Sequence, residues 1–100
     1  MMKKIVLLCN MGMSTSLMVT KMKQAAEKTG YDCEIAAYAL DEAKEAASDA
    51  DCILVGPQVK FKIKKIEEAC PGVPVKDIDM RNYGSLNGEA VLEMAKKMIG

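Results

Sequence analysis

The apolar run of residues 5–9 constrains the fold of this 100-residue chain more than any other feature. It is aliphatic and rich in β-branched residues, and no polar residue interrupts it. Such a run is typical of a strand that is buried on both faces, as in a parallel sheet covered by helices. It is also far too short to span a bilayer. We therefore expect residues 3–8 to form a central strand of an α/β domain.

Strand and helix patterns alternate along the rest of the chain. Strands are expected at 33–39, at 52–55 and around Val73, Val75 and Ile78, where Pro74 favours the edge of a sheet or the first residues of a strand. Helices are expected at 14–29, 41–50 and 57–70, and a last helix is expected after Asn87, a suitable N-cap. Residues 82–88 are rich in Gly, Asn and Ser and are expected to form a loop.

This order predicts one domain, residues 1–100, in the α/β class. Short loops and right-handed crossovers give a four-stranded parallel sheet in the order 2-1-3-4, with helices on both faces. In such a sheet the ligand site lies where the strand order reverses, at the carboxyl ends of the first and third strands. Those ends are Cys9 and Gly56.

Composition excludes several kinds of chemistry. The chain has no His, so catalytic triads and His-ligated metals are absent, and no cluster of Asp and Glu offers a metal site. We expect neither a metal nor a cofactor. With 14 basic and 14 acidic residues the net charge is zero, and no nucleic-acid partner is expected. The chain lacks coiled-coil heptads and a signal-peptide pattern, so we expect a cytoplasmic monomer.

The segment after the first strand predicts an anion site. The residues are Cys9, Asn10, Met11, Gly12, Met13, Ser14, Thr15 and Ser16. A short turn that opens a helix leaves backbone N–H groups unpaired, and the helix dipole adds a partial positive charge. Gly12 allows close approach to an anion, and the last three residues supply hydroxyl groups. Residues 10–16 are therefore the predicted phosphate-binding residues.

Cys9 is the predicted nucleophile of this site. A helix N-terminus lowers the pKa of a thiol, and a thiolate inside a phosphate cradle suggests a phosphocysteine. The plainer interpretation is that a lone Cys after a buried strand is a small core residue. The neighbouring glycine and hydroxyl run favour the functional interpretation. Cys33, Cys52 and Cys70 form no C-x-x-C pair with one another or with Cys9, and they are expected to be structural.

These motifs together resemble the IIB component of the bacterial phosphoenolpyruvate-dependent sugar phosphotransferase system, of the lactose/cellobiose/chitobiose type. The resemblance rests on Cys-x-x-Gly-x-Ser-Thr-Ser after a strand, on Gly-Pro-Gln-Val at residues 56–59, and on Tyr83-Gly84 and Asn87-Gly88 before the last helix. It covers essentially the whole chain. It implies a flavodoxin-like fold with a phosphatase-like phosphate loop.

The resemblance also implies a phosphoryl relay. A phosphohistidine on a IIA protein donates to Cys9, and the phosphocysteine donates to a sugar held by the membrane permease IIC. The sugar would be a β-glucoside-type disaccharide such as cellobiose, chitobiose or lactose. The chain would be peripheral to the membrane through IIC. Gly56, Pro57 and Gln58 would border the phosphoryl group, and Tyr83 would approach it or help a partner to dock.

Two other classes remain open from the residues. A low-molecular-weight tyrosine phosphatase shares the architecture, but it places an arginine six residues after the cysteine, where this chain has Thr15. It also needs an Asp-Pro pair, which is absent, and the only arginine is Arg81. A non-catalytic anion- or flavin-binding module would use the same loop with Cys9 inert. A response regulator is not supported, because it needs an Asp at the end of the third strand, where this chain has Gly56. A P-loop NTPase is not supported, because no G-x-x-x-x-G-K-[ST] motif occurs.

Two further features have two interpretations each. Met11 and Met13 either pack into the core or form an adaptable rim for partner proteins. The lysines of the third helix either form a solvated face or dock an acidic partner; they are Lys60, Lys62, Lys64 and Lys65. Tyr31 and Tyr38 are expected to be packing residues.

Overall fold

The structure, a computed structural model, describes residues 2–10 and 13–100, and these residues form a four-stranded parallel sheet. The strand order β2-β1-β3-β4 is the order that the sequence predicts. The strands are β1 (Lys3–Cys9), β2 (Cys33–Ala39), β3 (Cys52–Val55) and β4 (Val75–Asp77). In the register, Leu8 of β1 lies beside Tyr38 on one side and Val55 on the other. The carboxyl ends of three strands therefore meet at one edge.

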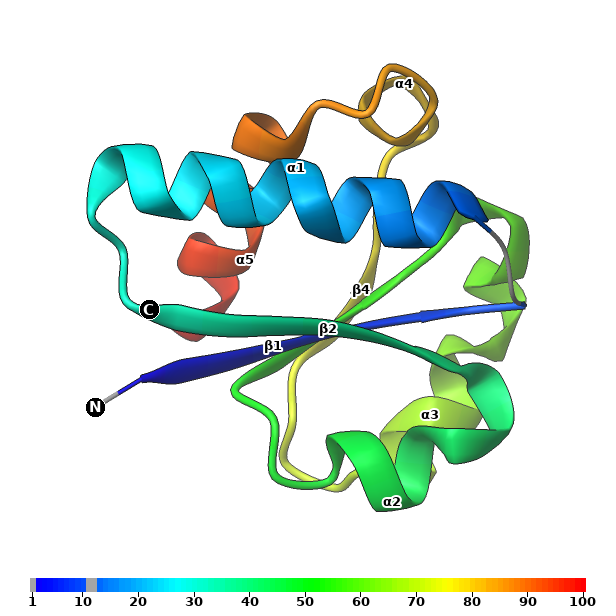
Figure 1. Cartoon of the computed structure of the whole chain (residues 1–100). Coiled ribbons are helices and arrows are strands. Elements are labelled where there is room, and N and C mark those ends of the chain that lie inside the picture. The colour runs from blue at the N-terminus through cyan, green and yellow to red at the C-terminus, as the bar shows by residue number, and fades with distance from the viewer. Residues whose placement is uncertain (1, 11–12) are drawn as a thin grey trace.

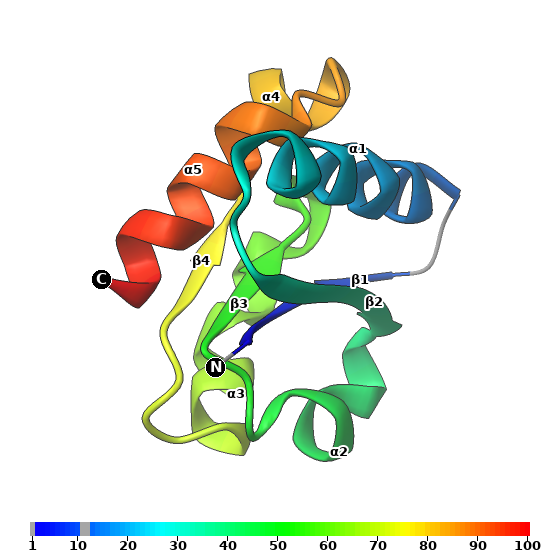
Figure 2. The same cartoon turned by 60° about the vertical axis from the view of Figure 1, so that its left-hand side comes forward.

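Helices cover both faces of the sheet, as expected (Figure 1, Figure 2). On one face lie α1 (Met13–Thr29), α4 (Met80–Gly84) and α5 (Gly88–Ile99). On the other lie α2 (Ala43–Ala47) and α3 (Ile63–Ala69), each preceded by a 3₁₀ turn, η1 (Leu40–Glu42) and η2 (Pro57–Lys62). No helix in the described ranges combines the length and apolar character needed to cross a membrane.

β1 supplies both hydrophobic cores because successive side chains of a strand point to opposite faces. Ile5 and Leu7 lie in the core beneath α1 and α5, while Val6 and Leu8 lie in the core against α2 and α3. All four are at most 1% exposed. Burial of each such side chain stabilises the fold by about 1.5–3 kcal/mol. The uninterrupted apolar run is thus explained by a strand that is covered on both sides.

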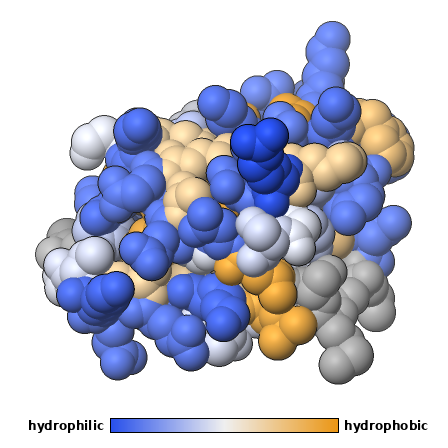
Figure 3. Space-filling view, turned by 90° about the horizontal axis from the view of Figure 1, so that it is seen from above, coloured by the Kyte–Doolittle hydropathy of each residue, from blue (hydrophilic) through white to orange (hydrophobic). Residues whose placement is uncertain are grey.

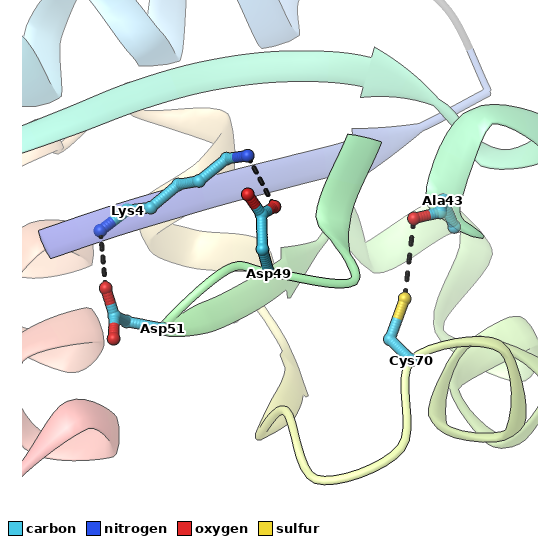
Figure 4. Close-up of polar contacts among 5 residues, drawn as sticks. All are labelled: Lys4, Ala43, Asp49, Asp51 and Cys70. Atoms are coloured by element: carbon cyan, nitrogen blue, oxygen red, sulfur yellow. Dashed lines mark hydrogen bonds and ion pairs between the residues drawn. The ribbon is translucent and has the colours of Figure 1, made fainter. Parts of the chain in front are cut away.

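The two helices on the α2–α3 face are shorter than the sequence predicts. The segment 41–50 forms η1 and the five-residue α2, because the residues that follow turn toward β1 (Figure 4). Asp49 accepts a hydrogen bond from Lys4 Nζ at 2.6 Å, and Asp51 accepts one from the Lys4 backbone N–H at 2.7 Å. The first of these bonds raises the pKa of Lys4 and lowers that of Asp49. Contacts of these two carboxylates with β1, far away in the sequence, therefore end the helix early.

The segment after Pro57 begins as the 3₁₀ turn η2 and becomes α-helical only at Ile63. Within η2, Val59 has non-helical dihedral angles, φ −123° and ψ 23°, and is only 2% exposed. Burial of the Val59 side chain in the core thus outweighs the preference of this segment for regular helix geometry. Pro57 opens η2 at a position where its missing N–H is not needed.

The prediction of a loop over 82–88 is wrong in its first half. Residues Met80–Gly84 form the short helix α4, because Asp79 caps it by accepting a hydrogen bond from the Asn82 N–H at 2.6 Å. The prediction that Asn87 caps the last helix is confirmed by a 3.1 Å bond from the Ala90 N–H to its side chain. β4 is an edge strand that begins directly after Pro74, also as expected.

Candidate functional site

Cys9 occupies the carboxyl end of the central strand. It is the last residue of β1 and is 7% exposed. Cys9 lines a groove together with Thr15 and Ser16 from the first turn of α1. α1 has 17 residues and no acidic residue in its first turn. The partial positive charge of the helix N-terminus is therefore not neutralised by its own side chains.

Tyr83 connects Cys9 to Thr15. The Tyr83 hydroxyl lies 3.1 Å from Thr15 Oγ1 and 3.9 Å from Cys9 Sγ, in hydrogen-bonding range for oxygen and for sulfur. Tyr83 is 6% exposed and Thr15 is 5% exposed. α4 places Tyr83 there, not a loop as the sequence suggested. Three side chains from β1, α1 and α4 thus form one buried polar cluster.

Gly56 brings its backbone against the thiol. A methyl group built on Gly56 would lie 3.3 Å from Cys9 Sγ and 3.1 Å from Gln58 Oε1. Both separations are tighter than ordinary carbon contacts of about 3.5–4.0 Å. The Gly56 N–H also donates to the Leu8 carbonyl at 3.1 Å, which continues the pairing between β1 and β3. Gly56 therefore lies next to Cys9, with the Gln58 side chain also close to Gly56, and the buried Pro57 begins η2.

A groove of about 220 Å³ opens beside Cys9. Its further lining residues come from the end of β2 and from η1: Ala37, Tyr38, Ala39 and Glu42. None of these was predicted as a site residue, and Tyr38, expected to be a packing residue, is 37% exposed. The predicted strand order could have indicated these residues, because it places the end of β2 beside the end of β1.

The other predicted phosphate-binding residues follow Cys9 directly in the sequence. Asn10 is exposed directly after β1, and Ser16 is exposed in the first turn of α1. Met13 and Ser14 are the first residues of α1. Met11 and Gly12 lie outside the described residues. The roles of residues 10–16 in phosphate binding remain predictions.

Metal-ligating side chains do not gather in the described part of the chain: no group of three or more His, Cys, Asp or Glu is close enough to hold an ion.

The remaining cysteines lie in a different environment from Cys9. Cys52 and Cys70 are completely buried, and the Cys70 thiol donates to the Ala43 carbonyl at 3.4 Å (Figure 4). Burial raises the pKa of Cys52 to about 12 and also raises the pKa of Cys70 and of the half-buried Cys33. All three are therefore protonated, and poorly nucleophilic, near neutral pH.

These environments predict the order in which the cysteines react. We expect iodoacetamide at neutral pH to modify Cys9 first, because a helix N-terminus favours its thiolate. Cys52 and Cys70 are expected to react only when the chain unfolds. Peptide mass mapping after a short reaction, with and without denaturant, measures this order. Earlier modification of Cys33 than of Cys9 would contradict the prediction.

Comparison with known proteins assigns the family. The profile described as "PTS system, Lactose/Cellobiose specific IIB subunit" matches residues 4–94. The "PTS system oligo-beta-mannoside-specific EIIB component" of Bacillus subtilis (strain 168) is 42% identical over an alignment of 100 positions, which covers 98% of this chain and 97% of that protein.

Solved structures agree in fold. The cellobiose-specific phosphotransferase IIB component from Borrelia burgdorferi superposes with a TM-score of 0.82 at 33% identity, over 99% of this chain and 93% of that one. The lactose-specific IIB component domain from Streptococcus pneumoniae superposes with a TM-score of 0.87 at 15% identity, over 98% of each chain. The second likeness concerns the fold alone. The chain belongs to the lactose/cellobiose-specific IIB subunit family of the phosphotransferase system.

Proposed function

We propose that Cys9 accepts a phosphoryl group from a phosphohistidine on a IIA protein and passes it to a sugar held by the permease IIC. In the first step the thiolate of Cys9 attacks phosphorus in line with the P–N bond. The S–P bond forms, the P–N bond breaks, and its electron pair stays on the imidazole nitrogen. In the second step a sugar hydroxyl forms the O–P bond, the S–P bond breaks, and sulfur regains its electron pair while the hydroxyl proton passes to a base.

The position of Cys9 between the end of β1 and the first turn of α1 supports this proposal most directly. Helix N–H groups and hydroxyl groups there can share the charge of a transferring phosphoryl group. The groove of about 220 Å³ is small for an organic cofactor, since such ligands occupy pockets of about 300–1,000 Å³. It suits a phosphoryl group delivered by another protein.

The sugar and the location follow from the partners. The curated relative named above is specific for an oligo-β-mannoside, and one structural neighbour is specific for cellobiose. We therefore place the acceptor among β-linked disaccharides of the cellobiose, chitobiose and lactose kind. The sugar site itself would lie in IIC. The chain would act as a monomer at the cytoplasmic surface of the membrane, where both partners reach the same edge of its sheet.

Intact mass measurement tests the function. The pure chain is incubated with phosphoenolpyruvate, the general phosphotransferase proteins and a panel of IIA proteins. We expect the mass of one phosphoryl group to be added, and to be released by thiol-specific reagents. Absence of any addition across the panel, with Cys9 also slow to alkylate, would instead favour a non-catalytic binding module.

Tyr83 has a defined part in the proposed transfer. A thiolate can only accept hydrogen bonds, so once Cys9 ionises the Tyr83 hydroxyl must donate to the sulfur. The Thr15 hydroxyl must then donate to Tyr83, across the observed 3.1 Å. This chain of two bonds stabilises the charged thiol and fixes its direction. Tyr83 is thus proposed to orient and activate the nucleophile.

The Tyr83→Phe variant is expected to lower the rate of phosphoryl acceptance about three- to tenfold, since one hydrogen bond to a reacting group is lost. Loss of that donor also raises the pKa of Cys9, so the pH profile of Cys9 alkylation should move to higher pH. Quenched-flow transfer and alkylation at several pH values measure the two effects.

Tyr31→Phe is the matched control. Tyr31 has a partly buried ring, with Lys96 Nζ 4.7 Å from its centroid. It precedes β2 and therefore lies near the amino ends of the strands, away from Cys9. Its hydroxyl is not expected to affect transfer. If Tyr83→Phe slowed transfer while leaving the alkylation profile unchanged, a role in activating the thiol would be ruled out.

A further inference from the structure

η2 exposes a large apolar side chain among positive charges. Phe61 is 74% exposed, more than any other large hydrophobic residue in the described ranges. The neighbouring basic residues are Lys60, Lys62, Lys64 and Lys65. We call these five residues the η2–α3 surface. The face seen from above the α1–α4 side carries separate apolar patches among hydrophilic residues (Figure 3). Leu17 and Met80 are also exposed, at 49% and 70%.

The backbone holds Phe61 outward. On either side of it Val59 and Ile66 are buried in the core at 2% and 4% exposure, which anchors the segment. The irregular dihedral angles of Val59 turn the chain between these anchors. The contact that the structure gives to the Phe61 ring is with Lys62 Nζ, 5.7 Å from the ring centroid. The Phe61 side chain is mostly outside the core, while buried residues on both sides fix its segment, and such anchoring lowers the entropy cost of binding.

The charges of the η2–α3 surface are available to a partner. The ion pairs found in the described residues are Lys4–Asp49 and Lys96–Glu93, so the lysines of this surface take no part in one. The chain as a whole has zero net charge, so the excess of positive charge on the η2–α3 surface is a local feature. Acidic residues of α3 follow only at Glu67 and Glu68. An aromatic side chain surrounded by cations fits an acidic surface with an apolar pocket.

The segment that carries the η2–α3 surface starts beside Gly56, the residue that packs against Cys9. β1 and β3 are paired in parallel with Leu8 beside Val55, and Gly56 packs against the thiol. η2 begins at the next residue, Pro57, at the same edge of the sheet (Figure 1). A protein that brings a phosphoryl group to Cys9 therefore approaches this surface.

We propose that the η2–α3 surface docks the phosphohistidine-bearing donor protein. Phe61 enters an apolar pocket of the donor, and the lysines face donor carboxylates and the incoming phosphoryl group. The proposal rests on the function proposed above. The acceptor fits less well, because cytoplasmic loops of membrane proteins carry an excess of Lys and Arg, which a basic surface would repel.

The proposal is tested by measuring rates of phosphoryl transfer. The donor is the phosphorylated IIA protein that phosphorylates the wild-type chain. Phe61→Ser is expected to lower the second-order rate constant about tenfold or more, as for a central interface residue. The double variant Lys60→Glu/Lys62→Glu should lower it most at low ionic strength and lose the salt dependence of the wild type. At saturating donor the first-order transfer rate should stay unchanged.

Matched variants at the opposite edge of the sheet give the controls. Met2→Ser removes another exposed apolar side chain, and Lys23→Glu/Lys97→Glu reverses the same number of exposed charges. Both should transfer within about twofold of the wild type, because exposed charges far from an interface contribute little. Cys9 alkylation should be the same in all variants.

Four other outcomes would overturn the docking proposal, and they can be told apart by experiment. If the wild type is phosphorylated and both η2–α3 variants match it, the docking proposal fails and the proposed function stands. A wild type that accepts no phosphoryl group defeats both. Slower alkylation of Cys9 in Phe61→Ser would make its effect structural. Binding to phosphatidylserine vesicles that the variants lose, with unchanged transfer, would assign the surface to lipid.

Discussion

Serine in place of Cys9 is expected to abolish phosphoryl acceptance and to leave the fold intact. A hydroxyl stays protonated at neutral pH and is a far weaker nucleophile than a thiolate. The serine would therefore form an O–P bond much more slowly than the cysteine forms the S–P bond. The exchange of sulfur for oxygen is small in volume, and the Tyr83 hydroxyl remains a possible partner. We expect the free energy of unfolding to change by no more than about 1–2 kcal/mol. Intact mass after incubation with the donor system measures acceptance, and thermal unfolding measures the fold.

Cys33→Ser is the matched control for this substitution. Cys33 is half-buried in β2, and burial raises the pKa of its thiol. The control should be phosphorylated at the wild-type rate. A phosphoryl group on Cys9→Ser would show that the Cys9 thiol is not required for phosphoryl acceptance.

The sheet could be predicted because its signals are local and strong. The apolar run that forms β1 is buried on both faces, which is typical of a parallel sheet between two helical layers. The strand order then follows from right-handed crossovers. Cys9 was singled out for the same reason, because the end of a central strand before a long helix favours an anion site in such a fold.

The short elements could not be predicted in the same way. α2 ends early because Asp49 and Asp51 contact Lys4, which lies more than 40 residues away in sequence. η2 departs from helix geometry because Val59 is drawn into the core. In each case a tertiary contact outweighs a weak local preference.

The site was only partly predictable for a related reason. Tyr83 lies 74 residues from Cys9, and no periodicity or spacing reports that their side chains meet. The Asp79 cap that creates α4 was a readable local signal, but it does not show where Tyr83 points. Tyr38 and Glu42 border the groove because β2 pairs with β1, which the strand order implied without naming side chains.

Gly88→Ala is expected to destabilise the protein strongly, although alanine is the better helix former. Gly88 is the first residue of α5, which packs directly on α1. A methyl group on Gly88 would lie 2.4 Å from the Lys21 carbonyl carbon and 2.6 Å from its oxygen. These are backbone atoms, which cannot swing aside as a side chain can. The two helices would have to separate by about 1 Å to restore ordinary carbon contacts.

That separation would loosen the core between α1 and α5, where Met22, Leu92 and Ala95 are completely or almost completely buried. Close-packed interiors do not yield to such a shift without loss. We expect the free energy of unfolding to fall by about 2–3 kcal/mol, and Tm by about 10–15 °C. Urea unfolding at fixed temperature measures the first, and calorimetry the second.

Gly84→Ala separates the steric effect from helix propensity. Gly84 is the last residue of α4, and a methyl group there meets no atom within 4 Å. An unhindered exchange of Gly for Ala in a helix stabilises by up to about 1 kcal/mol, so this variant should be neutral or slightly more stable. If Gly88→Ala were as stable as Gly84→Ala, the helices would have room to part, and the close approach of α5 to Lys21 would not be a constraint on the fold. A large loss in Gly88→Ala alone would instead show that the contact between the two helices requires glycine at this position.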